Sequence, residues 1–132
     1  MITFRYRKEP SGGKVIYRPV ADVKLLSVSG MWIDFHPYID SGADVTLVPL
    51  TLGKLLGFQV SDQQVSQIGG IRGSIPVIYE RKRMKVGECE FEVLLGWALV
   101  EDVPPLLGRT DVFEKFEITF KQSEGVVNFE LV

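Results

Sequence analysis

Short strand-like runs, each interrupted by a turn that contains glycine, constrain the fold of this chain more than any other feature. Runs of about four to eight residues that are apolar, or that alternate between apolar and polar, are typical of β-strands. We predict strands at Ile2–Arg7, Lys14–Arg18, Asp22–Val28, Met31–Ile39, Val65–Ile68, Ser74–Val86, Glu90–Leu95, Glu117–Lys121 and Val126–Val132. The breaks hold residues that favour hairpin turns between antiparallel strands, at Ser11-Gly12-Gly13, Ser29-Gly30, Gly69-Gly70, Gly87 and Ser123-Glu124-Gly125.

Only two segments predict a helix, and both are short. The first, about Pro49 to Leu56, carries four leucines at mixed three- and four-residue spacings and is closed by Gly57. The second, about Asp111 to Phe116, follows Thr110 as its N-cap, with Glu114 at the reciprocal position of a capping box. The rest of the chain is expected to be β-structure, so the fold class is all-β, a small barrel or sandwich.

The size and charge of the chain limit the classes of function. With 132 residues, 45% of them hydrophobic, the chain fits one globular domain, residues 1–132. A formal net charge of -2 argues against a nucleic-acid partner, which usually requires a basic excess. The basic run Arg81–Lys85 invites that interpretation, but alternation along a strand would leave most of its charges in solvent.

Metal, disulfide and membrane functions are also disfavoured by the sequence. One cysteine, Cys89, cannot form an internal disulfide. One histidine and one cysteine cannot supply the three or four conventional ligands of a zinc site without several carboxylates. We expect no metal and no cofactor. The first residues lack the apolar core of a signal peptide. The longest apolar run, Val93–Val100, is far shorter than the roughly 18 residues a membrane-spanning helix requires. We therefore expect a cytoplasmic protein with no membrane partner.

An acidic loop lies between two apolar runs. Asp40 follows Tyr38-Ile39, and the sequence Ser41-Gly42-Ala43-Asp44 leads into Val45-Thr46-Leu47-Val48. A carboxylate beside apolar side chains is costly to ionise, so it must pair, accept hydrogen bonds or raise its pKa. Such acids concentrate at functional sites. Asp-Ser-Gly on its own is commonly just a turn, because Asp and Ser bond neighbouring backbone and Gly tolerates left-handed geometry.

Two further elements follow this loop in a fixed order. They are a glycine-rich hairpin, Ile68-Gly69-Gly70-Ile71-Arg72-Gly73, and an apolar-Gly-Arg element, Pro105-Leu106-Leu107-Gly108-Arg109. With these two elements, the sequence resembles the retroviral-type aspartic proteases, or retropepsins, over about residues 20–120. That family carries an apolar-apolar-Asp-Thr/Ser-Gly-Ala-Asp loop, a glycine-rich flap, and an apolar-apolar-Gly-Arg turn that leads into a short helix.

The resemblance implies a retropepsin-like closed β-barrel with one or two short helices and a flap hairpin. It implies a homodimeric aspartic endopeptidase in which Asp40 of each chain activates water to hydrolyse a peptide or protein substrate. Ser41, Gly42, Ala43, Asp44, Gly108 and Arg109 would support the active-site loop, with Asp44 and Arg109 as an ion pair. Ile68, Gly69, Gly70, Ile71, Arg72 and Gly73 would form the substrate-binding flap.

Two features differ from the family and leave an alternative open. Arg72 replaces a small residue at the flap tip, and the C-terminal hairpin 117–132 could either join two subunits or cover the sheet edge and prevent pairing. Residues 1–19 form an additional N-terminal strand region. The alternative is a non-catalytic retropepsin-like module for dimerisation or peptide binding.

Overall fold

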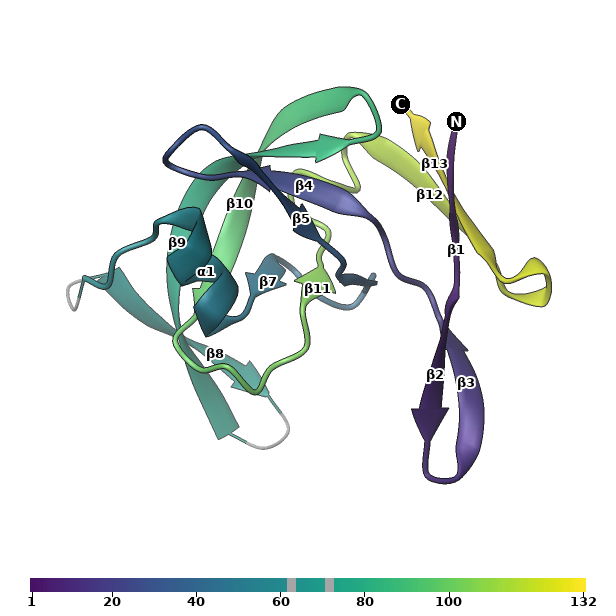
Figure 1. Cartoon of the computed structure of the whole chain (residues 1–132), viewed down its shortest axis with the longest axis horizontal. Coiled ribbons are helices and arrows are strands. Elements are labelled where there is room, and N and C mark those ends of the chain that lie inside the picture. The colour runs from purple at the N-terminus through teal and green to yellow at the C-terminus, as the bar shows by residue number, and fades with distance from the viewer. Residues whose placement is uncertain (62–63, 71–72) are drawn as a thin grey trace.

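The computed structural model describes residues 1–61, 64–70 and 73–132. These residues are mostly β-structure, arranged as one large curled sheet, a three-stranded sheet and a separate hairpin (Figure 1). The prediction of an all-β chain is confirmed, with one α-helix in the described part, α1 (Leu50–Leu56). No helix in these residues is both long enough and apolar enough to cross a membrane.

The large sheet curls into a half-barrel. Its strands, in spatial order, are β5 (Trp32–Phe35), β4 (Val23–Leu26), β9 (Gly73–Val86), β10 (Cys89–Ala98), β7 (Thr46–Val48), β11 (Leu106–Leu107) and β6 (Tyr38–Ile39), and β8 (Val65–Gly70) pairs with β9 off this path. The path ends at β5 and β6, so closure into a barrel stays a prediction. Two of its pairings, β10 with β7 and β11 with β6, are parallel and were not expected from the turn pattern.

The remaining strands lie beside the half-barrel. The second sheet has the order β1 (Ile2–Arg5), β13 (Val126–Leu131) and β12 (Phe116–Lys121), so the predicted C-terminal hairpin is confirmed. The separate hairpin consists of β2 (Arg7–Ser11) and β3 (Lys14–Arg18) and projects from the body of the molecule (Figure 1). We call β2 and β3 with their turn the N-terminal hairpin.

Aromatic side chains join the two sheets in one hydrophobic core. Phe129 of β13 lies 5.1 Å from Phe4 and 5.5 Å from Phe116 between ring centroids, and Phe116 lies 5.8 Å from Phe91 of β10. All four rings are buried. The edge-to-face contacts of Phe4 with Phe129 and of Phe91 with Phe116 add to the free energy gained by burying the rings. The three-stranded sheet is therefore packed against the half-barrel and not hinged away from it.

The first predicted helix is confirmed and the second is wrong. Helix α1 ends at Gly57, whose φ of 94° supplies the left-handed cap expected of glycine. Residues 111–115 form turns instead of a helix, because Asp111 has a φ of 69°. Its carboxylate accepts a hydrogen bond from Leu94 N–H at 2.9 Å, which holds the residue in this conformation. Glu114 accepts from Asp111 N–H and not from Thr110, one residue away from the predicted capping box.

Candidate active site

The parallel pairing of β6 with β11 places Asp40 beside Gly108. Leu106 lies opposite Tyr38 and Leu107 opposite Ile39, so the next residue of each strand, Gly108 and Asp40, leaves the sheet at the same level. Asp40 N–H donates to Leu107 O at 3.0 Å. Two segments far apart in the sequence, the acidic loop and the apolar-Gly-Arg element, are thus brought together as the sequence predicts.

The Asp40 carboxylate is partly exposed and is fixed by its own loop. Its Oδ1 accepts a hydrogen bond from Gly42 N–H at 2.8 Å, and Ala43 N–H donates to Asp40 O at 3.2 Å. The carboxylate thus accepts a hydrogen bond from the backbone, one of the arrangements that the sequence predicted. A Cβ on Gly42 would lie 3.2 Å from Asp40 Oδ1, so a small residue lets the backbone approach the carboxylate.

Arg109 ties the other side of the loop to the chain after β11. Its Nη1 donates to Ser41 O at 2.6 Å and its Nη2 pairs with Asp44 Oδ1, which confirms that Arg109 and Asp44 form an ion pair. Backbone bonds reinforce the link, because Arg109 N–H donates to Ala43 O and Thr110 N–H to Asp44 O, both at 2.9 Å. Asp44 is largely exposed, so the ion pair itself adds little stability. Most of the stabilisation of this link comes from the hydrogen bonds to the backbone.

Thr46 is a supporting residue that the sequence did not reveal. It is fully buried in β7, and its Oγ1 accepts a hydrogen bond from Gly108 N–H at 3.1 Å. A buried N–H without a partner would cost about 1–3 kcal/mol, so this hydroxyl stabilises the junction of the two segments. The only sequence signal was a polar residue within the apolar run that follows the acidic loop.

The glycine-rich segment forms the end of a β-hairpin next to this loop. Strands β8 and β9 pair from Val65 opposite Ile78 to Gly70 opposite Gly73. Ile71 and Arg72, predicted at the tip, lie outside the described residues. A pocket of about 340 Å³ lies between the hairpin and the acidic loop and is lined by Asp40, Gly42, Ala43, Asp44, Val45, Leu47, Ile68, Gly69, Tyr79 and Leu106.

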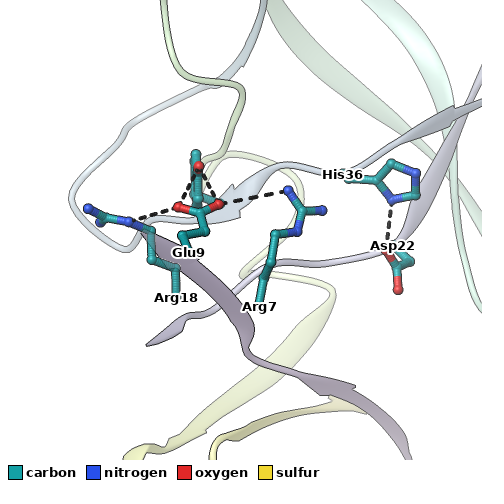
Figure 2. A network of polar contacts seen from close by, with 6 residues as sticks. Arg7, Glu9, Arg18, Asp22 and His36 are labelled. Atoms are coloured by element: carbon teal, nitrogen blue, oxygen red, sulfur yellow. Dashed lines mark hydrogen bonds and ion pairs between the residues drawn. The ribbon is translucent and has the colours of Figure 1, made fainter. Parts of the chain in front are cut away.

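A second pocket lies on another side of Asp40, against the N-terminal hairpin. It has a volume of about 580 Å³ and is lined by Glu9, Arg18, Pro19, Tyr38, Ile39, Asp40, Pro104 and Leu106. Tyr38 Oη donates to both carboxylate oxygens of Glu9, at 3.0 and 2.8 Å, and Arg18 Nε lies 3.1 Å from Glu9 Oε1 (Figure 2). Sequence reasoning missed Glu9, Arg18 and Tyr38 as site residues.

Replacing Tyr38 with phenylalanine is expected to lower the free energy of unfolding by about 1–2 kcal/mol at neutral pH, because Glu9 loses a donor. The hydrogen bond to Glu9 raises the pKa of Tyr38 above 10.0. The phenol's contribution is therefore fully present below about pH 10 and is lost as pH rises through the raised pKa. Urea unfolding should show the same difference in the free energy of unfolding between variant and parent at pH 7 and pH 9, and a smaller difference at pH 11. Tyr17→Phe on the exposed face of β3 is the control, and an equal loss there would refute the role of the Glu9 contact.

The fold is shared with known aspartic proteases. No protein-family model and no curated protein sequence matches the chain. Among solved structures, EIAV protease in complex with the inhibitor HBY-793 is similar with a TM-score of 0.55 and 20% identity, over 70% of this chain and 82% of that one. A retropepsin-like aspartic protease from Rickettsia conorii has a TM-score of 0.66 and 14% identity, over 96% of this chain and 98% of that one. At these identities the likeness shows the fold, and the chain has the retropepsin-like fold.

Proposed function

We propose that this chain of retropepsin-like fold is a homodimeric aspartic endopeptidase, in which Asp40 of each of two copies activates one water molecule. The observation that carries the proposal is the position of Asp40. It is partly exposed between two pockets, on a loop that is hydrogen-bonded to the Gly108–Arg109 segment. A carboxylate that served only to form a turn would not require hydrogen bonds between its loop and a segment so distant in the sequence.

The chemistry needs two carboxylates. Hydrolysis of an amide by water requires one group to accept a proton from the water and another to donate a proton towards the carbonyl oxygen or the leaving nitrogen. Two carboxyl groups within hydrogen-bonding distance cannot both ionise easily, so they share a proton and can perform both tasks. Each chain supplies one Asp40 loop, so the second carboxylate would come from a second copy across a two-fold axis. A monomer would then be inactive.

The neighbouring residues would align the two loops. Ser41 is exposed, and its hydroxyl makes no hydrogen bond within the described residues, which suits a contact across the axis. Gly42 and Ala43 keep the loop narrow where a peptide would approach. Asp44 and Arg109 would orient the loop without taking part in the reaction.

The β8–β9 hairpin would act as the flap. Gly69 and Gly73 are exposed, and a Cβ added to either would meet no atom within 4 Å, so the hairpin has open space around these two positions. Closure over an extended peptide would exclude water from the pocket next to Asp40 and offer backbone groups to the substrate. The proposed flap comprises Ile68, Gly69, Gly70, Ile71, Arg72 and Gly73.

One observation favours the alternative of a non-catalytic module. The terminal strands β1, β12 and β13 already form a sheet within a single chain. Terminal strands that are paired internally are not required to interleave with those of a partner. The open edges at β1 and β12 could still extend the sheet across two copies.

The solution mass and the cleavage of a diverse peptide library between pH 4 and 7 test the proposal together. A dimer that cleaves peptides, and whose cleavage is blocked by a transition-state mimic of aspartic proteases, is the expected result. A monomer, or a dimer that binds peptides and releases no products, would contradict it and support the binding module.

A further inference from the structure

We propose that the pocket between Asp40 and the N-terminal hairpin selects an acidic side chain of the peptide, which Arg18 binds through its guanidinium group. This inference rests on the proposed function, because it assumes that a peptide lies beside Asp40. It adds a specificity-determining residue from the N-terminal strand region, outside the segment whose motifs resemble the family.

The lining of the pocket places a guanidinium group and apolar surface near the proposed reacting group. Asp40 and Arg18 line the same cavity of about 580 Å³, so a peptide residue placed against Asp40 on this side comes within reach of the hairpin. Tyr38, Ile39, Pro104 and Leu106 supply apolar and aromatic surface between them. An aliphatic stem that ends in a polar group matches such a lining.

Glu9 is already occupied and is a poor acceptor for a ligand. Both its carboxylate oxygens accept from Tyr38 Oη, and Oε1 also pairs with Arg18 Nε. Only 20% of the Glu9 side chain is exposed. Glu9 therefore holds Arg18 in place and is not available to pair with a basic side chain of the peptide.

Arg18, in contrast, retains unused donors. Its side chain is half exposed, and its Cζ lies 5.7 Å from the centroid of the Tyr38 ring. The ion pair of this guanidinium with Glu9 is made through Nε, so the two terminal nitrogens can donate to a carboxylate in the paired geometry that arginine favours. Figure 2 shows Arg18 and Arg7 on opposite sides of Glu9.

The local charge also favours an anion at the hairpin end of the pocket. Arg7 Nη1 lies 4.0 Å from Glu9 Oε2, so two guanidinium groups surround one carboxylate. Asp40 lies elsewhere in the lining and would repel an anion placed next to it. The acidic group must therefore sit against Arg18, with its stem running towards Asp40.

The test compares two peptides that differ only in Glu or Gln at one position. A peptide library screened for binding to the non-cleaving Asp40→Asn protein identifies the position that prefers Glu or Asp, and the pair is then titrated into this protein at pH 6, with the Glu side chain ionised. We expect the Glu peptide to bind about tenfold more tightly or better. Arg18→Gln should abolish this preference, Arg18→Lys should restore part of it, and Lys14→Gln, which removes the same charge from the same hairpin, should not change it.

The outcomes separate this inference from the proposed function. If the parent protein cleaves peptides but the Asp40→Asn protein binds the Glu and Gln peptides equally tightly, the proposed role of Arg18 is wrong and the endopeptidase proposal stands. If the parent protein cleaves no peptide but the Asp40→Asn protein binds the Glu peptide more tightly through Arg18, the pocket selects an acidic side chain and the catalytic proposal fails. Preference for a lysine peptide, or no peptide binding at all, overturns the inference.

Discussion

Replacing Asp40 with asparagine is expected to abolish peptide cleavage, by on the order of 10³-fold or more, while the fold and the dimer remain intact. The amide cannot accept a proton from water, so the general-base step is lost. The amide oxygen can still accept the hydrogen bond that Gly42 N–H donates to Asp40 Oδ1, so the loop keeps its conformation. Cleavage rate, melting temperature and solution mass are measured on the same preparation.

Asp34→Asn is the matched control for this substitution. Asp34 is an exposed carboxylate of β5 that pairs with Lys24 Nζ at 2.6 Å, and it lines neither pocket beside Asp40. The same chemical change there should leave the cleavage rate unchanged. Cleavage by the Asp40→Asn protein at the rate of the parent would eliminate the endopeptidase assignment.

Replacing Gly108 with alanine is expected to destabilise the chain by about 3 kcal/mol or more, and cleavage should be lost with it. A Cβ on Gly108 would lie 2.4 Å from Val45 C, 2.6 Å from Val45 O and 2.8 Å from Thr46 N. These are backbone atoms and cannot rotate away as a side chain could. The two segments must therefore separate, which breaks the Gly108 N–H bond to Thr46 and disturbs the pairing of Leu107 with Asp40.

Gly69→Ala tests whether this loss is specific to the crowded position. A Cβ on Gly69 would meet no atom within 4 Å, so its free energy of unfolding should stay within about 0.5 kcal/mol of the parent. Urea unfolding of both variants gives the comparison. Equal stability of the Gly108→Ala protein and the parent would show that the acidic loop and the apolar-Gly-Arg element are not packed as described.

Local signals predicted the parts of the fold that depend on neighbouring residues. The leucine spacing and Gly57 located helix α1, and the glycines at 12, 13 and 125 located two hairpins, because their positive φ values are set within a few residues. The predicted strand Met31–Ile39 divides into β5 and β6 around His36 and Pro37. Pro37 has no N–H to donate, and the chain there turns to pair with other segments.

Contacts between distant residues could not be predicted in the same way. Asp111 leaves the helical region because Leu94 N–H binds its carboxylate, and β7 and β11 are short strands formed through partners elsewhere in the chain. The resemblance to the retropepsins predicted that Asp44 and Arg109 pair, as observed. Glu9, Arg18 and Thr46 lie outside the recognisable motifs, so only the tertiary structure shows that they surround or support the Asp40 loop.

The number of transition-state mimics bound per chain tests the shared active site most directly. Calorimetric titration of the parent protein with a peptide-like transition-state mimic should give one molecule bound per two chains, and the Asp40→Asn protein should bind the mimic much more weakly. One molecule bound per chain, or tight binding by a monomer, would contradict a site assembled from two Asp40 carboxylates.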